Sequence, residues 1–163
     1  MDEEERLVQE IENAFSDTSY PSDNTIVPLY NNEPHCAECA ELAETFRDKT
    51  WKSVPIKTLA GWRGSLSLFT NEAFQYYLPA FLQAALLHTA ETDTLWENIF
   101  YILTPPEENT GSKMERFLQR ISGFTNKQKD VLKRYMRLYL EIETSYEVHG
   151  KTRVIEFWKL NDL

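Results

Sequence analysis

Apolar residues occupy every side of one central stretch of the chain and only one side of the stretches around it. From Ala73 to Leu87 they leave no continuous polar face, although Gln75, Pro79 and Gln83 interrupt them. A helix that is apolar all round belongs inside a protein or a membrane. Because a membrane span needs roughly 20 predominantly apolar residues, we expect a buried central helix over about residues 73–87 and no membrane segment.

Pro79 lies in the middle of this predicted helix. Proline cannot donate a hydrogen bond to the carbonyl of Gln75, and its ring crowds that carbonyl, at a cost of about 3 kcal/mol in a regular helix. We therefore predict a bend between Gln75 and Pro79. The hydroxyl of Thr70 is well placed to accept from the free amides of the first turn, so the helix should begin there.

The flanking stretches carry apolar residues three or four positions apart, which is the spacing of helices that pack one face on a core. We expect such helices over 2–15, 36–46, 93–103, 112–122 and 126–149, with a shorter helical turn after Pro55. Thr125 and Gln128 form a capping-box pattern at the start of the long helix, and Gly150 is placed to end it. The tail over 145–160 fits either a short docking helix or one arm of a hairpin, and we favour the helix.

A long proline-rich loop is expected over residues 16–34, where Pro21, Pro28 and Pro34 alternate with Asp, Asn and Ser. Four apolar residues should anchor this loop to the core in an extended form: Ile26, Val27, Leu29 and Tyr30. The 163 residues, of which 42% are hydrophobic and 26% charged, suffice for one domain with one core. We therefore predict a mainly α, single-domain helical bundle over residues 1–163.

Charge is distributed unevenly along the chain, whose formal net charge is −9. The first 50 residues carry 13 acidic and 3 basic side chains, whereas residues 111–163 carry 11 basic and 7 acidic ones. Net acidity repels a phosphate backbone at long range, so we do not expect non-specific nucleic-acid binding. The acidic N-terminal part is a simpler partner for the basic C-terminal part than nucleic acid is. The two parts could meet within one chain or between two copies that form a homodimer.

A basic surface over residues 113–137 offers an alternative function in nucleic-acid binding. Its members are Lys113, Arg116, Arg120, Lys127, Lys129, Lys133, Arg134 and Arg137. Tyr135 and Tyr139 could stack on bases beside them, but both tyrosines fall on the apolar face of the predicted helix. Core packing of the tyrosines and solvent exposure of the charges is therefore the preferred interpretation.

Residues 35–39, His-Cys-Ala-Glu-Cys, form the cluster whose spacing suits a metal. Two thiolates three positions apart at a helix start face the same side, so His35, Cys36 and Cys39 could hold zinc. A fourth ligand would have to come from His88 or His149. Because no second cysteine pair is present, buried or inert thiols are the preferred interpretation, and zinc and a redox dithiol are the alternatives. A thiol at a helix start ionises more readily, which favours reactivity at Cys36.

Signatures of known enzyme classes are missing from the sequence. It contains no nucleophile elbow, no phosphate-cradling glycine motif, no HExxH and no evident acid/base pair of carboxylates. Glu38 and Glu41, near the cysteines, are more simply explained as solvated helix charges. The acidic N-terminus also lacks the basic and apolar regions of a secretory signal. We therefore predict a non-enzymatic cytoplasmic protein that binds an unidentified protein partner in a regulatory or immunity-type role, with zinc or thiol chemistry at residues 35–39 as the alternative.

Short motifs along most of the chain resemble those of a family of small, mostly bacterial proteins described as a domain of unknown function. The matching positions are Ile11, Phe15, Tyr20-Pro21, residues 35–39, Trp51, Phe74, Tyr76-Tyr77-Leu78-Pro79-Ala80, Leu103-Thr104-Pro105-Pro106, Phe124-Thr125 and Gln128. The tyrosine, leucine and proline string is the most distinctive of these. Where the family favours Pro-Gly, this chain has Pro21-Ser22. The resemblance implies a single helical domain and brings no activity, cofactor or catalytic residue with it.

Overall fold

Helices account for 67% of the computed structural model, which describes residues 2–143 and 148–162. The nine α-helices of these residues are α1 (Glu3–Phe15), α2 (Ala37–Phe46), α3 (Ile56–Gly61), α4 (Asn71–Leu87), α5 (Thr89–Thr92), α6 (Leu95–Ile102), α7 (Ser112–Ser122), α8 (Asn126–Ile142) and α9 (Lys151–Trp158). Short 3-10 turns add η1 (Asp23–Thr25), η2 (Trp51–Ser53), η3 (Leu66–Leu68) and η4 (Leu160–Asp162). The prediction of a mainly α, compact helical bundle is confirmed.

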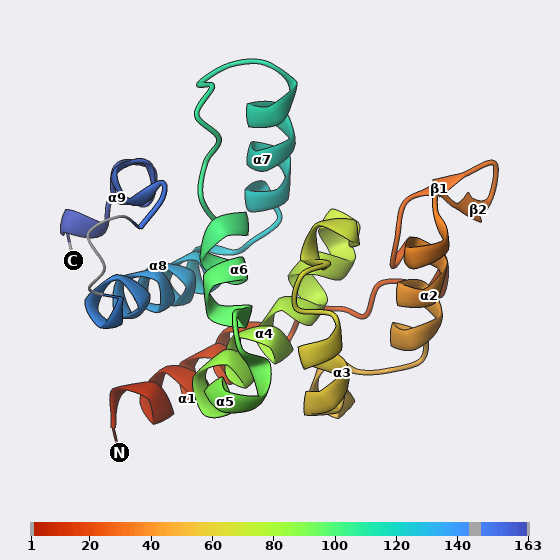
Figure 1. Cartoon of the computed structure of the whole chain (residues 1–163), viewed down its shortest axis with the longest axis horizontal. Coiled ribbons are helices and arrows are strands. Elements are labelled where there is room, and N and C mark those ends of the chain that lie inside the picture. Colours follow the sequence, from red (N-terminus) through yellow and green to blue (C-terminus); the bar gives the residue numbers. More distant parts are fainter. Residues whose placement is uncertain (1, 144–147, 163) are drawn as a thin grey trace.

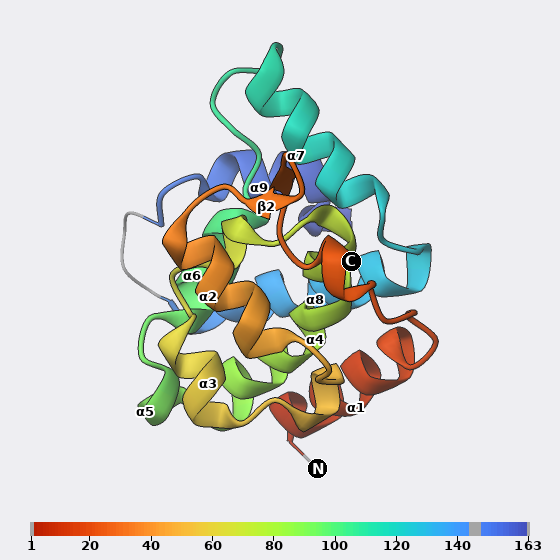
Figure 2. The same ribbon diagram turned by 90° about the vertical axis from the view of Figure 1, so that its right-hand side faces the viewer.

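The central helix predicted from the apolar stretch is α4, which lies in the middle of the molecule in two perpendicular views (Figures 1 and 2). It contacts α1, α3, α5 and α6, and 12 of its 17 residues are buried. Thr70 caps it as predicted, because its hydroxyl accepts from the amide of Ala73 at 3.1 Å. The helix continues through Pro79 to Leu87, so proline lies within it without ending it.

Aromatic rings join α4 to the end of α2. The rings of Phe46, Phe69, Tyr77 and Phe81 contact one another, with centroids 4.9–6.1 Å apart. The hydroxyl of Tyr77 also lies 2.8 Å from the carbonyl oxygens of both Phe46 and Lys49. Rings and hydroxyl together anchor the C-terminal end of α2, a helix that lies at one edge of the molecule (Figure 1).

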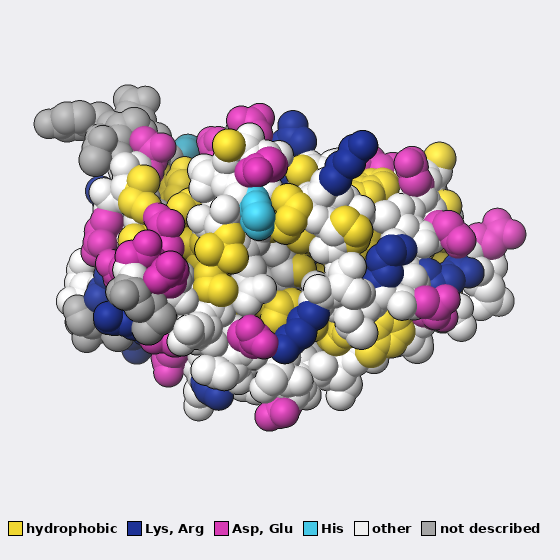
Figure 3. All heavy atoms as spheres, turned by 90° about the horizontal axis from the view of Figure 1, so that it is seen from below, with side chains coloured by type: hydrophobic (Ala, Val, Ile, Leu, Met, Phe, Trp, Pro, Cys, Tyr) yellow, Lys and Arg dark blue, Asp and Glu magenta, His cyan; other side chains and the backbone are white. Residues whose placement is uncertain are grey.

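The acidic N-terminal helix meets the basic α8 within one chain. α1 packs against both α4 and α8. Glu10 forms an ion pair with Arg134, and Lys127 donates to the carbonyl of Asn13 at 2.9 Å. The first turn of α1 contains three further glutamates. Acidic side chains gather at the left of Figure 3, the side on which α1 begins in Figure 1. The acidic α1 and the basic α8 thus contact each other within one chain. The homodimer stays a prediction.

The segment from 16 to 34 contains more structure than a loop. After η1, β1 (Leu29–Tyr30) pairs antiparallel with β2 (Glu33–Pro34). Asn31 and Asn32 connect the strands with positive φ angles of 52° and 65°, as a tight hairpin turn requires. Ile26 and Val27 are buried as predicted, but 39% of Leu29 and 64% of Tyr30 are exposed, so the expected anchoring of these two residues is wrong.

The C-terminal tail is a docking helix in the part that the structure describes. α8 ends at Ile142, earlier than the predicted residue 149, and residues 144–147 lie outside the described residues. Gly150 precedes α9 with φ 80° instead of ending α8. Trp158 donates from Nε1 to the carbonyl of Leu103 at 2.8 Å, which fixes α9 beside the end of α6. None of the helices in the described residues is long and apolar enough to cross a membrane.

Candidate functional site

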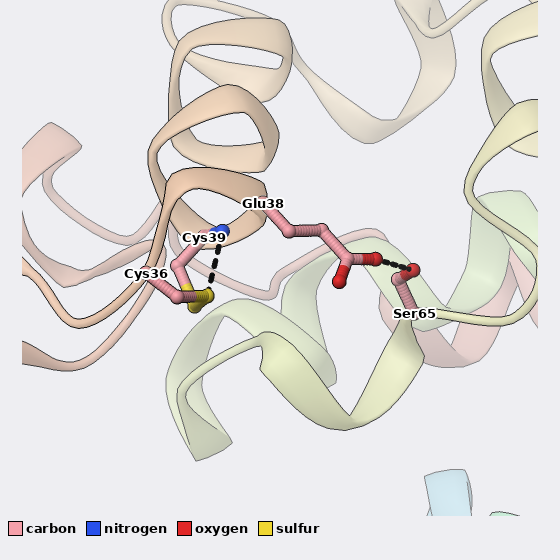
Figure 4. Close-up of a disulfide and its surroundings, with 4 residues drawn as sticks. All are labelled: Cys36, Glu38, Cys39 and Ser65. Carbon is pink, nitrogen blue, oxygen red and sulfur yellow. Dashed lines mark hydrogen bonds between the residues drawn. A yellow bond between two sulfur atoms is a disulfide. The ribbon is translucent and has the colours of Figure 1, made fainter.

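Cys36 and Cys39 are joined by a disulfide at the start of α2 (Figure 4). Cys36 is the N-cap residue, and its Sγ accepts from the backbone amide of Cys39 at 3.2 Å. Cys36 is partly exposed, whereas Cys39 is buried. The carboxylate of Glu38 turns away from the sulfurs and accepts from the hydroxyl of Ser65 at 2.7 Å (Figure 4). The predicted position of the cysteines at a helix start is therefore confirmed.

The residues predicted to hold zinc do not form a metal centre in this state. Bridged sulfurs offer no thiolate to a cation, and the ring of His35 lies 5.0 Å from that of Tyr30 in the hairpin. The proposed remote ligands face glutamates instead: His88 lies 3.9 Å from Glu91 and His149 lies 3.8 Å from Glu107. Among the described residues no three His, Cys, Asp or Glu side chains are grouped to hold an ion. Zinc at residues 35–39 stays a prediction, and it concerns the reduced protein.

A cleft of about 720 Å³ lies where the segment 103–111 connects α6 to α7, and we call it the cationic cleft. Its charged walls carry four cationic side chains and two carboxylates: Arg63, Lys113, Arg116 and Arg153, with Glu107 and Glu108. His149 lines it as well. Three of the cations form ion pairs with carboxylates. The distances are 3.9 Å for Arg63–Asp93, 3.1 Å for Lys113–Glu108 and 3.7 Å for Arg153–Glu107. The exposed Arg116 makes no ion pair with any other described residue.

Apolar side chains form part of the same walls. Leu66 and Phe117 are buried core residues whose edges reach the cleft, and Tyr101 is 65% exposed. The ring of Phe117 lies 5.1 Å from that of Phe157, which joins α7 to α9. The walls therefore combine apolar surface with guanidinium and ammonium groups.

A second hollow of about 550 Å³ adjoins the cationic cleft and shares Arg116 and Phe117 with it. Its lining contains Arg120 but no carboxylate. The Arg120 guanidinium lies 4.8 Å from the ring centre of Phe74 and donates weakly to the carbonyl of Phe69 at 3.4 Å. Burial lowers the pKa of Arg120 from its ordinary value, since the charged form loses solvation. The two hollows together form a continuous region with an excess of positive charge.

The predicted basic surface over residues 113–137 is divided between several sites. Lys113, Arg116 and Arg120 of α7 line the two hollows, whereas Lys127 and Arg134 contact α1. Tyr135 is buried, and the ring of Tyr139 lies 4.6 Å from that of Phe100. The preferred interpretation of both tyrosines as packing residues is confirmed, and a base-stacking surface does not form there. The spacing of the three α7 cations placed them on one helix face, but it did not indicate a cleft, whose walls also come from distant parts of the chain.

Comparison with known proteins gives a family without a known activity. The sequence profile of a family described as "Family of unknown function (DUF6714)" matches residues 3–161. The chain belongs to this family. The DUF6714 profile covers both the disulfide and the cationic cleft, so each lies within the family domain. No curated protein and no solved structure matches the chain.

Proposed function

We propose that the protein acts without turnover, by binding an acidic segment of another protein in the cationic cleft, in a regulatory or immunity-type role. The observation that supports this function is a positive charge at the cleft on a chain with a net charge of −9. Its four cations face three carboxylates when Asp93, the partner of Arg63, is counted, and Arg116 has no carboxylate partner among the described residues. Such a reversal of sign attracts acidic groups to one place and repels them from the rest of the surface.

The apolar content of the cleft favours a protein segment over a small anion. Exposed aromatic rings and arginines are enriched in the centres of protein interfaces, and Tyr101 and Arg116 supply both here. An acidic segment with one or two apolar side chains would place its carboxylates near Arg116 and its apolar groups against Tyr101 and Phe117.

A selection of random peptides displayed on phage, carried out on the immobilised protein, tests this function. We expect the enriched peptides to contain Asp or Glu beside an aromatic or aliphatic residue. Arg116→Glu should weaken the binding of these peptides about tenfold or more, because it replaces the unpaired cation by an anion. Affinity should also fall as salt is added.

Lys57→Glu is the matched control for this experiment. Lys57 is exposed on α3 and does not line the cleft, so its reversal changes the net charge equally without changing the cleft. Peptides that bind Arg116→Glu and the wild type equally well, or a selection that enriches no peptide, would overturn the proposal. Equal losses in both variants would show attraction by net charge alone and would also contradict it.

A further inference from the structure

The disulfide at the start of α2 joins a partly exposed cysteine to a cysteine that the core covers. Cys36 is partly exposed, whereas only 4% of the Cys39 surface is exposed. We propose that Cys36 and Cys39 form a reversible redox pair that exchanges with dithiols, with Cys36 as the sulfur that enters the mixed disulfide. This activity goes beyond the proposed binding function and does not depend on it.

Access to the bridge determines which sulfur an external thiolate attacks. A thiolate must approach one sulfur while the other leaves, so the rate depends on which sulfur is reachable. Cys39 lies on the buried face of α2 together with Leu42 and Phe46. An incoming thiol therefore reaches Cys36, and Cys39 serves as the leaving sulfur and, in the reverse direction, as the resolving thiol.

The backbone around Cys36 stabilises its thiolate once the bridge is open. Cys36 is the N-cap of the ten-residue α2, and the amide of Cys39 already points at its sulfur from 3.2 Å. The free amides of a helix start favour an anion there. Glu38, the acidic residue of this first turn, has its carboxylate bound to Ser65 and directed away from the sulfurs (Figure 4).

The exchange moves two electrons and two protons from an external dithiol to the bridge. A thiolate of the dithiol attacks Sγ of Cys36, the bond between the two cysteine sulfurs breaks, and Cys39 leaves as a thiolate that takes up a proton. The second thiol of the reductant loses its proton and attacks the reductant sulfur of the mixed disulfide. Cys36 then leaves as a thiolate that can take up a proton, and the reductant is oxidised to a disulfide.

The fold does not depend on this bridge. The two cysteines are three residues apart, and a disulfide that closes so short a loop restricts the unfolded chain least. α2 is held at its other end, by the rings around Phe46 and by the Tyr77 hydroxyl. Opening the bridge should therefore leave a folded protein that can carry out the reverse reaction.

Two single-cysteine variants treated with glutathione disulfide test the redox pair. Cys39→Ala leaves Cys36, and Cys36→Ser leaves Cys39 with a serine, itself a preferred N-cap residue, at the helix start. Intact-mass measurement follows the mixed disulfide with glutathione. We expect Cys36 in the first variant to react about tenfold or more faster than Cys39 in the second, and to keep reacting at lower pH.

A peptide with the sequence of residues 34–40 and the Cys39→Ala change is the control, because it carries the same thiol without the helix. Circular dichroism shows whether both variants are folded. The reduced wild type should regain its bridge in a buffer of oxidised and reduced glutathione. The proposal fails if the folded variants react equally fast, if Cys36 reacts no faster than the peptide, or if the wild type stays reduced in glutathione disulfide alone.

Discussion

Tyr77 and Tyr135 are both buried, but their hydroxyl groups have different surroundings. The Tyr77 hydroxyl lies 2.8 Å from each of two carbonyl oxygens. The Tyr135 hydroxyl, whose ring lies 5.4 Å from that of Trp96, has no hydrogen-bond partner among the described residues. Burying a hydroxyl costs free energy, which a hydrogen bond offsets. The same residue type is therefore stabilising at one position and costly at the other.

Removing each hydroxyl separately should affect the free energy of unfolding differently. Tyr77→Phe leaves two carbonyls without their donor and should lower the free energy of unfolding by about 1–2 kcal/mol. Tyr135→Phe removes a buried group that makes no bond and should leave that free energy unchanged or raise it by up to about 1 kcal/mol. Urea unfolding followed by fluorescence measures both. A larger loss for Tyr135→Phe than for Tyr77→Phe would contradict this account.

Gln128 shows how much of a residue's role can be predicted from its neighbours in sequence. The capping box is confirmed. The backbone amide of Gln128 donates to the Thr125 hydroxyl at 3.2 Å, and the backbone amide of Thr125 donates to Oε1 of Gln128 at 3.0 Å. Gln128 also donates to the carbonyl of Ala14 at 3.2 Å and to the hydroxyl of Thr18 at 2.9 Å. These partners lie more than 100 residues away in the chain, and only the packing of α1 on α8 brings them close.

Long helices could be predicted from the sequence, whereas very short elements could not. A helix such as α4 repeats its apolar pattern over several turns, but a two-residue strand is too short to show alternation. The β1–β2 hairpin depends on Asn31 and Asn32 in the left-handed region, a conformation that asparagine tolerates but does not require. The same limit applies at Gly150. The glycine was predicted to follow the end of one helix, but it precedes the start of the next helix, α9.

Gly150→Ala should destabilise the junction between the end of α6 and α9. Gly150 has φ 80°, and an added Cβ would lie 2.5 Å from Cγ2 of Thr104. The left-handed conformation alone costs an alanine about 1–2 kcal/mol, and the overlap adds to this. We expect the free energy of unfolding, measured in urea, to fall by about 2 kcal/mol or more.

The source of this loss can be separated by two further variants. Thr104→Ser removes Cγ2 but keeps the hydroxyl that donates to the carbonyl of Phe100 at 2.8 Å, so Gly150→Ala should cost less in that background. Gly61→Ala is the matched control, since nothing lies within 4 Å of its added Cβ and its φ is ordinary. It should leave the free energy of unfolding unchanged or raise it by up to about 1 kcal/mol, because alanine is the better helix former. An equal effect of both glycine changes would rule out the explanation from φ and overlap.

The whole molecule combines distant segments in ways that no single stretch of sequence indicates. The cationic cleft takes its walls from positions between Arg63 and Arg153, so its existence depends on the relative placement of α6, α7 and α9. The cysteine pair, by contrast, was visible as a local motif. Its spacing alone could not distinguish a disulfide from free thiols or zinc ligands, because that outcome depends on the redox and metal conditions around the protein.

Stability of the whole domain should fall in alkaline solution. Burial raises the pKa of Tyr77 and of Tyr135 well above the ordinary value, and desolvation also raises the pKa of Tyr20 and Tyr139. Above pH of about 10 the unfolded chain loses these phenolic protons while the folded chain keeps them, so unfolding becomes easier. The loss should approach about 1.4 kcal/mol per pH unit for each of the buried Tyr77 and Tyr135 while it stays protonated, and it should be smaller for the exposed Tyr20.

Urea midpoints between about pH 8 and pH 11 measure this dependence. The double variant Tyr77→Phe, Tyr135→Phe removes the two most strongly affected phenols and should lose less stability per pH unit than the wild type. Equal slopes would assign the alkaline effect to other groups, such as lysines in ion pairs, and would contradict the role of the buried tyrosines.

The hydrogen bond between Glu38 and Ser65 connects the two sites described above. Glu38 lies between the bridged cysteines in sequence, and Ser65 lies in the chain between Gly64 and Leu66, which line the cleft. If an occupant of the cleft shifted this hydrogen bond, it would alter the ease of reducing the bridge by the same factor as reduction would alter occupancy. Because one exposed hydrogen bond contributes about 1 kcal/mol, that reciprocal factor is limited to roughly five.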